Sequence, residues 1–133
     1  MSRRSDDDDP ARRRARTLAF RLGLSAETRA AALLLVKGFR IAARRWRSPV
    51  GEIDLVARRG RLLVFVEVKA RGALDDAAEA VTERQRRRIA AAAEAWLASH
   101  ADDLGRDIRF DAVLVVPWRM PRHIKAAFDV TPP

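Results

Sequence analysis

The sequence predicts an α/β fold in which a mixed β-sheet is flanked by helices. Segments with helical and strand patterns follow one another in the order helix, three strands, helix, strand, which is typical of a sheet with helices on its faces. The chain has 133 residues, the size of one domain, and 48% of them are hydrophobic, enough to form a core. We therefore expect a single domain over 17–133.

The first 16 residues, MSRRSDDDDPARRRAR, are predicted to be a disordered charged tail. Four consecutive Asp are followed by an arginine cluster, and almost nothing apolar is available to bury. A flexible acidic run has no fixed geometry, so we expect no metal site there.

The first predicted helix spans 25–37. Ser25 is an expected N-cap and Gly38 an expected stop after the last turn. Residues 30–36 form a broad apolar face, which we expect to pack on the sheet.

Four strands are predicted, over 39–47, 52–57, 62–70 and 108–116. The second and third are separated by a tight connection, ARRGR, and are expected to form a hairpin. The five apolar residues at 62–66 are typical of a buried strand. For the C-terminal tail, from 117 on, we expect at most a short helical turn.

The second helix is predicted over about 83–99. Thr82 and Gln85 match the capping box, in which two side chains reciprocally satisfy free backbone amides. Its buried stripe is expected to contain Ile89, Ala93, Trp96 and Leu97.

The charge balance points to a polyanionic partner. The formal net charge is +9 and the pI is about 11.4, which favours nucleic acid first and an anionic membrane second. The alternatives are a basic surface that serves solubility, or an arginine bias of the coding sequence. Because Lys occurs only at 37, 69 and 125, Lys69 stands out in a chain that otherwise uses Arg as its cation.

Several protein classes are not expected. The chain has no Cys, which excludes a disulfide framework and a thiolate metal site. The N-terminus lacks the apolar region of a secretory signal, and no apolar run approaches the roughly 20 residues of a membrane span. We expect a soluble cytoplasmic protein.

Two carboxylates and a lysine interrupt the apolar strands. Residues i and i+2 of a strand share a face, so Glu67 and Lys69 should project together. If the second and third strands pair as a hairpin, Asp54 lies beside Glu67. Adjacent carboxylates repel each other and raise a pKa unless a cation lies between them.

Oxygen ligands on a rigid sheet suit Mg²⁺ or Mn²⁺. Asp54 and Glu67 are the expected ligands, and the backbone carbonyl of Val68 is a further one. Lys69 would then hold or help deprotonate a water, or neutralise a phosphate. The alternative is a surface Glu–Lys ion pair of little energetic value. The buried strand, the second acid and the basic charge favour the functional interpretation.

These residues carry a resemblance. GEIDLVA followed by VFVEVKAR resembles the PD-(D/E)XK nuclease signature, an acid in one strand and E-x-K in the next. More closely, the chain resembles the YraN-like (UPF0102) family, which is assigned to that restriction-endonuclease-like fold and is similar to archaeal Holliday junction resolvases. The likeness covers about 23–128 and includes KGFRI, AVTERQRRRI, RFDAVLV and HIKAAF.

The resemblance implies Asp54 and Glu67 as metal ligands and Lys69 as the catalytic lysine. Glu27 matches an acid that nucleases of this fold use as an extra ligand; the alternative is an acid favoured by the helix dipole. Gln85 matches a glutamine near the lysine, and capping is its equal alternative.

The resemblance thus predicts a metal-dependent endonuclease that hydrolyses phosphodiester bonds in nucleic acid, with DNA favoured over RNA. Branched or flap structures are the substrates, and a homodimer the assembly, that the resemblance suggests. The alternative is a non-catalytic nucleic-acid-binding module of a DNA- or RNA-processing assembly. Arg47, Arg71, Gln85 and Arg86 are the candidate nucleic-acid contacts, with backbone contacts independent of sequence. We expect Asp111 to anchor Arg109 or a backbone group, and His100 and His123 to have surface or capping roles.

Overall fold

The structure is a computed structural model that describes residues 10–11, 14, 25–70, 82–116 and 119–128. The predicted disordered tail, 1–16, lies outside these ranges except for three residues. The description below is confined to these parts of the chain.

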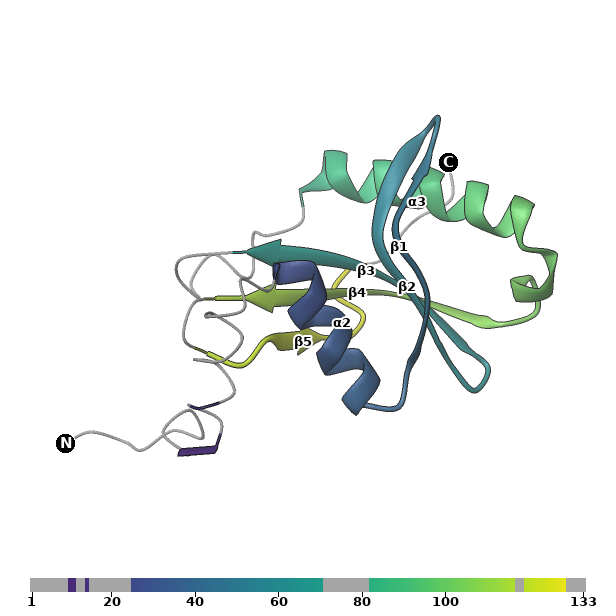
Figure 1. The fold of residues 1–133 in the computed structure, drawn as a ribbon. Helices are drawn as coiled ribbons and strands as arrows, with labels where there is room; N and C mark the ends of the chain where they lie inside the picture. The colour runs from purple at the N-terminus through teal and green to yellow at the C-terminus, as the bar shows by residue number, and fades with distance from the viewer. Residues whose placement is uncertain (1–9, 12–13, 15–24, 71–81, 117–118, 129–133) are drawn as a thin grey trace.

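A five-stranded mixed sheet forms the centre of the fold, in the order β1-β2-β3-β4-β5 (Figure 1). Neighbouring strands are antiparallel except β3 and β4, which are parallel. Helix α3 lies between these two strands in the chain and belongs to the crossover that a parallel pair requires. The predicted mixed sheet flanked by helices is thereby confirmed. The elements are α2 (Ala26–Val36), β1 (Arg40–Ser48), β2 (Gly51–Arg59), β3 (Leu62–Ala70), α3 (Glu83–Ser99), β4 (Asp107–Val115) and β5 (Arg122–Ile124).

The ends of α2 follow the expected capping rules. The Ser25 hydroxyl accepts a hydrogen bond from the Thr28 amide at 3.1 Å. At the other end, Gly38 has a φ of +92° and the Phe39 amide donates to the Leu34 carbonyl at 3.0 Å. This is the Schellman arrangement, which glycine adopts without steric cost.

Helix α3 begins with the predicted capping box. The Gln85 amide donates to the Thr82 hydroxyl at 3.2 Å, and the Thr82 amide donates to the Gln85 side chain at 3.0 Å. The apolar stripe predicted for this helix is buried or partly buried. Within the described ranges, no helix has the length and apolar character needed to cross a membrane.

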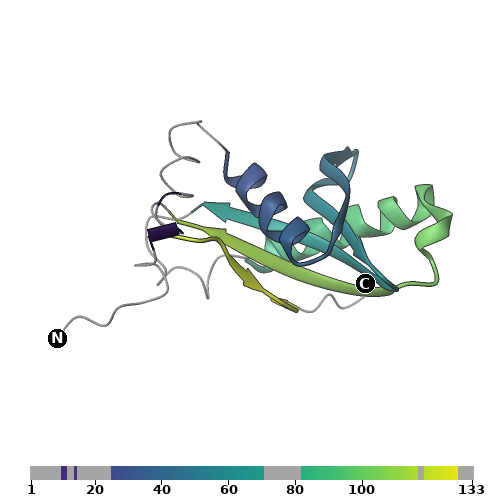
Figure 2. The same ribbon diagram turned by 60° about the horizontal axis from the view of Figure 1, so that its bottom comes forward.

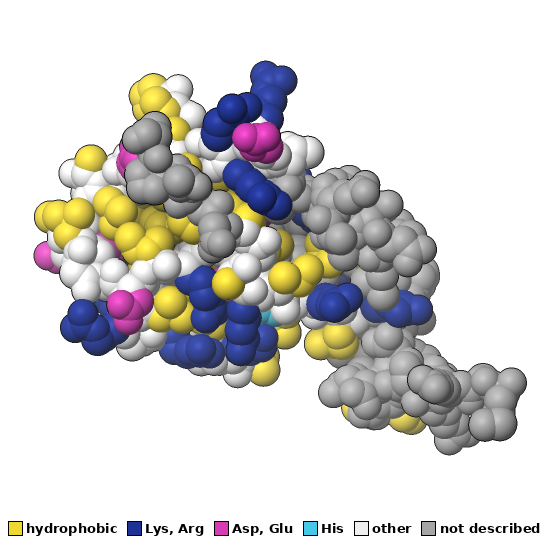
Figure 3. All heavy atoms as spheres, turned by 180° about the vertical axis from the view of Figure 1, so that it is seen from behind, with side chains coloured by type: hydrophobic (Ala, Val, Ile, Leu, Met, Phe, Trp, Pro, Cys, Tyr) yellow, Lys and Arg dark blue, Asp and Glu magenta, His cyan; other side chains and the backbone are white. Residues whose placement is uncertain are grey.

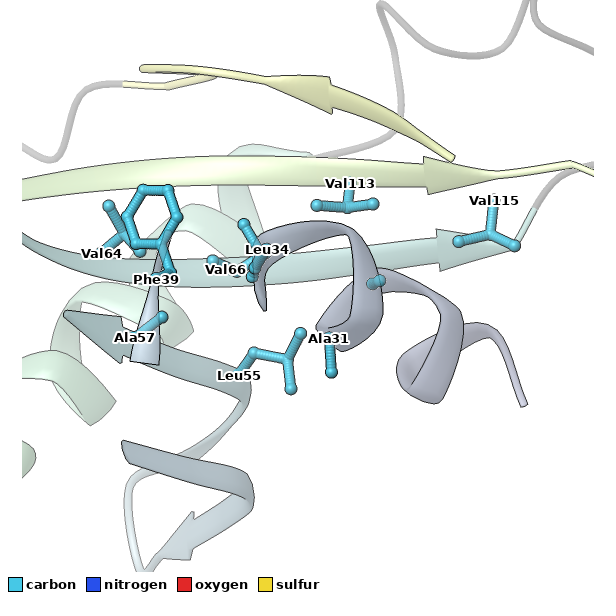
Figure 4. Close-up of a cluster of buried hydrophobic side chains, with 10 residues drawn as sticks. Ala31, Leu34, Phe39, Leu55, Ala57, Val64, Val66, Val113 and Val115 are labelled. Carbon is cyan, nitrogen blue, oxygen red and sulfur yellow. The ribbon is translucent and has the colours of Figure 1, made fainter. Parts of the chain in front are cut away.

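The two faces of the sheet are covered by different helices. Along β3, Val64 and Val66 pack with Leu34 of α2, and Figure 4 shows this cluster. The alternating Phe65 packs on the other face with Trp96 of α3. Strand periodicity therefore assigns each side chain of β3 to one of two cores.

Two strand predictions need correction. β2 extends to Arg59, and Arg58 and Arg59 pair with β3, so the turn consists only of Gly60 and Arg61. Gly60 has a φ of +59°, which lets the hairpin close tightly. The tail contains β5, which pairs with the edge of β4 instead of forming a helical turn (Figure 2). Three residues are too few to show an alternating pattern in the sequence.

Helix α3 approaches the beginning of β2 closely. A Cβ atom built on Gly51 would lie 2.8 Å from the Arg88 carbonyl oxygen. Glycine is therefore required for this contact. The contact fixes the first half of α3 beside β2, three residues before Asp54.

A buried aspartate joins α3 to the hairpin. Asp103, which is 0% exposed, follows α3 in the short 3₁₀ helix Ala101–Asp103. It accepts two hydrogen bonds from Arg58 at 2.8 Å and one from the Trp96 indole at 2.9 Å. The Arg58 hydrogen bond outweighs burial and lowers the Asp103 pKa to about 2.

Replacing Asp103 should weaken the fold and its pH dependence. Because its folded-state pKa lies below the ordinary 3.8, the carboxylate stabilises the fold above that pH and this contribution is lost as the pH falls toward 2. We expect Asp103→Asn to lower the free energy of unfolding by roughly 2–4 kcal/mol at pH 7 and to make the decline in acid shallower. Urea unfolding at several pH values measures both effects.

The neighbouring Asp102→Asn is the matched control, because Asp102 is exposed. It should change the free energy of unfolding by less than about 0.5 kcal/mol. Equal effects of the two substitutions would show that Asp103 does not hold these elements together.

Candidate metal and catalytic site

The sheet opens between β2 and β3 at the position of the two predicted carboxylates. The paired residues of these strands end at Leu55 and Val66, whereas β3 remains paired with β4 as far as Ala70. Beyond this point the Val68 amide donates to the Asp54 carboxylate at 2.8 Å. A side-chain oxygen thus replaces the backbone acceptor that a continued ladder would provide.

This opening between β2 and β3, called the fork below, brings Asp54 and Glu67 together, as expected from the hairpin. The two carboxyl groups are close enough for each to shift the pKa of the other. Burial, followed by the charge of Asp54, raises the Glu67 pKa to about 7. Burial also raises the Asp54 pKa, although the Val68 amide opposes this shift. The pair therefore holds a proton near neutral pH where two anions would repel.

Lys69 shares the face of Glu67, as the strand period predicts. Its Nζ lies 3.2 Å from a Glu67 carboxylate oxygen, and the side chains are only 12% and 16% exposed. This ion pair is therefore not a solvated surface pair. One ammonium faces two carboxylates, so the group carries one negative charge in excess when both acids are ionised.

This arrangement fits a small divalent cation. Mg²⁺ is held in proteins by one or two carboxylates and keeps several waters. The Val68 carbonyl points to the same side of β3 as the Val68 amide, and hence toward Asp54. Among the described residues, no three His, Cys, Asp or Glu side chains gather as a metal site. The donors present are therefore two carboxylates and one carbonyl.

Glu27 lies in a separate ion-pair cluster. Each of its carboxylate oxygens accepts a hydrogen bond from an arginine of β1, from Arg44 at 2.9 Å and from Arg45 at 2.6 Å. Burial alone would raise the Glu27 pKa, but the two guanidinium groups lower it. The role of Glu27 as a metal ligand stays a prediction, and its position in the first turn of α2 agrees with the dipole alternative.

Arg45 connects this cluster to the carboxylate pair. It lies opposite Asp54, between the pairs Arg44–Leu55 and Trp46–Ile53. Its φ of +48° is strained for a residue with a side chain. Successive residues of a regular strand face opposite ways, so this distortion lets both arginines reach Glu27. The sequence gives no signal for it.

The structure describes three of the four predicted nucleic-acid contacts. Arg47 is exposed and lies 3.6 Å from Glu52. Gln85 is engaged in the capping box, its alternative interpretation, and Arg86 lies over the Phe128 ring at 5.9 Å. Arg71 lies outside the described residues. The binding roles of these four residues stay predictions.

A second polar cluster was only partly anticipated. Asp111 binds Arg109 and the Ala126 amide, as expected, but it also accepts from His123 at 2.7 Å. The His123 side chain is 2% exposed, so its predicted surface or capping role is wrong. His100 follows the last turn of α3, where its ring contacts the Trp96 carbonyl at 2.9 Å, as a capping residue would.

Comparison with known proteins identifies the family. The model of the uncharacterised protein family UPF0102 matches residues 26–115. A UPF0102 protein of Rhodopseudomonas palustris (strain BisB18) is 58% identical, covering 99% of this chain and 100% of the relative. Another from Bradyrhizobium sp. (strain ORS 278) is 62% identical, covering 88% of this chain and 83% of the relative. The chain, which carries the half-buried Asp54–Glu67–Lys69 group inside the matched region, belongs to the UPF0102 family.

Proposed function

We propose that the protein is a metal-dependent endonuclease of the PD-(D/E)XK type that hydrolyses phosphodiester bonds in DNA. The observation that carries the proposal is the coupled Asp54–Glu67 carboxylate pair, with Asp54 held by the Val68 amide and Lys69 3.2 Å from Glu67. An acid in one strand and E-x-K in the next is the arrangement of that nuclease signature. The net charge of +9 suits a polyanionic substrate.

The roles of the three side chains follow from their chemistry. Asp54 and Glu67, with the Val68 carbonyl, would hold Mg²⁺ or Mn²⁺, which supplies the positive charge that acidifies water and neutralises the phosphate. Asp54 is fixed in direction by the Val68 amide. Lys69 is held against Glu67 and can hydrogen-bond the attacking water or a phosphate oxygen.

The finer identity of the substrate rests on resemblance. Likeness to archaeal Holliday junction resolvases favours branched or flap DNA, with a homodimer as the active form. A non-catalytic nucleic-acid-binding module is the competing function, and metal-dependent product distinguishes the two.

Cleavage assays test the proposal. We expect the protein with Mg²⁺ or Mn²⁺ to cut at least one of labelled single-stranded, duplex, flap or four-way-junction DNA. Asp54→Asn and Lys69→Met should each lower the rate at least about 100-fold, since each removes a group at the reacting phosphate. Denaturing gels report the product, and circular dichroism reports folding.

Glu52→Gln is the control with the same charge change as Asp54→Asn. Glu52 is two residues away, exposed and paired with Arg47, so this variant should cleave like the unsubstituted protein. Binding of these DNAs without metal-dependent product would replace the nuclease with the binding module.

The pH dependence of stability tests the metal site independently of turnover. The folded-state pKa of Glu67, about 7, lies above the ordinary 4.5. The metal-free protein should therefore lose stability as the pH rises from 4.5 through 7, by an upper bound of roughly 3 kcal/mol. We expect Glu67→Gln to remove this loss and to be the more stable protein at pH 8.

Added Mg²⁺ should reverse the stability difference between the unsubstituted protein and Glu67→Gln at pH 8. A ligand that binds only the folded state raises the melting temperature, so the unsubstituted protein should gain stability with Mg²⁺ at pH 8 and Glu67→Gln should gain less. Equal responses of the two proteins to Mg²⁺ would remove Glu67 from the metal site.

Glu27→Gln separates the two interpretations of the first-helix acid. Because both Glu27 oxygens are occupied by guanidinium groups, we expect this variant to keep the full thermal response to Mg²⁺. The melting temperature with and without the ion is the measurement. A response as weak as that of Glu67→Gln would assign Glu27 to the metal as a ligand.

A further inference from the structure

A cluster of cations surrounds the buried His123–Asp111 pair on the α2 side of the sheet. Its members are Lys37 at the end of α2, Arg59 at the end of β2, Arg109 in β4 and Lys125 just after β5. The charges of Lys125, Arg59 and Arg109 all act on Lys37 and, together with burial as the largest cause, lower its pKa. The contacts agree: Arg59 donates to the Lys37 carbonyl, Arg109 binds Asp111, and Lys125 directly precedes Ala126, whose amide also binds Asp111.

Buried groups fix the position of Lys37. Its ammonium donates to His123 Nδ1 at 2.8 Å, and His123 Nε2 donates to Asp111 at 2.7 Å. Asp111 is 0% exposed and holds Arg109 as well. The lysine is therefore oriented by a hydrogen-bonded chain, and Asp111 has no further capacity for the other cations.

Arg59 is also held in place. Its guanidinium lies over the Phe39 ring at 4.4 Å and donates to the Lys37 carbonyl at 3.2 Å. The ion pairs formed within the described ranges include none for Lys37, Arg59 or Lys125. By contrast, the arginines that contact Glu27 and Asp103 each have a carboxylate partner. Three cations without a carboxylate partner repel one another, and an anion would relieve that repulsion.

The cluster lies apart from the candidate cleavage site. Asp111 pairs with Val66 of β3, whose side chain faces α2, whereas Glu67 faces the α3 side. All three lysines of this arginine-rich chain belong to one of the two places: Lys69 to the carboxylate pair, Lys37 and Lys125 to the cation cluster. In Figure 3, Lys and Arg side chains gather along the lower part of the molecule.

We propose that Lys37, which the His123–Asp111 pair orients, binds the phosphodiester backbone of a nucleic acid together with Arg59 and Lys125. These cations lie on the face of the sheet opposite the candidate cleavage site. Cations contributed by three segments match a polymer with repeated phosphates better than a single small anion. The identification of the ligand as nucleic acid rests on the proposed function and on the net charge of +9. Contacts of this kind position the substrate without reading its sequence.

The test is the salt dependence of DNA binding by Lys37→Gln/Lys125→Gln. A labelled 20-base-pair duplex is titrated in EDTA, which prevents cleavage, at several KCl concentrations. Removing one lysine–phosphate interaction should reduce the slope of log affinity against log salt by about 1. We expect the slope to fall by about 2 and the affinity at low salt to fall at least about 10-fold.

Lys37→Arg/Lys125→Arg is the matched control, because it keeps both charges and should keep the slope. An unchanged slope and affinity in Lys37→Gln/Lys125→Gln would overturn the proposal. Competition by millimolar inorganic phosphate that removes the difference between the two double variants would also overturn it, since the cluster would then hold a single phosphate. So would binding to phosphatidylserine vesicles that is abolished in the Gln variant while DNA binding is kept.

The outcome is independent of the cleavage assays. If the protein cuts no DNA, but Lys37→Gln/Lys125→Gln binds DNA more weakly, the cation cluster is supported as a binding site and the nuclease function is contradicted. If the protein cuts DNA and this variant binds DNA normally, the binding role of the cation cluster is contradicted and the nuclease function is supported.

Discussion

The candidate site depends on one hydrogen bond, from the Val68 amide to the Asp54 carboxylate. An amide at the margin of a sheet needs an acceptor, and in a continued hairpin the acceptor would be a backbone carbonyl. Because Asp54 takes that place, β2 can leave β3 while β3 stays paired with β4. The same bond orients the carboxylate toward Glu67 and leaves the Val68 carbonyl pointing into the fork. Sheet geometry and site geometry are thus one arrangement.

The direction of the pKa shift separates the structural acids of this fold from the candidate functional ones. Asp103 and Asp111 are each 0% exposed, and arginines with further donors keep their pKa values at about 2. Glu67 is also largely buried, yet its pKa rises to about 7, because burial and then the charge of Asp54 both disfavour its anion. A chain so rich in arginine has the means to neutralise this pair, as it does at Asp103. Perturbation by burial and a like charge is characteristic of functional sites.

Sequence patterns specified the sheet and both helices because these depend on local capping and on periodicity. Ser25, Gly38 and Thr82 all act as the sequence indicates. The patterns also specified which face Glu67 occupies, since alternation along a strand is strict. They could not specify β5, whose three residues are defined by the edge of β4. Nor could they show that the Asp111–His123 pair orients Lys37, because those three residues meet only through tertiary packing.

The Asp54–Glu67–Lys69 group and the cation cluster around His123 have opposite charge imbalances. This difference bears on how a substrate would bind. At the fork, two carboxylates face one ammonium. When both acids are ionised, the missing positive charge favours binding of a divalent cation. Around His123, cations outnumber their acid and the excess favours phosphate. Both imbalances destabilise the isolated chain, since like charges at close range repel. A polyanion that binds together with a divalent cation reduces the repulsion at both clusters. The polyanion alone or the cation alone would reduce it at only one. The charge distribution therefore favours a function in which metal and nucleic acid bind the same molecule together.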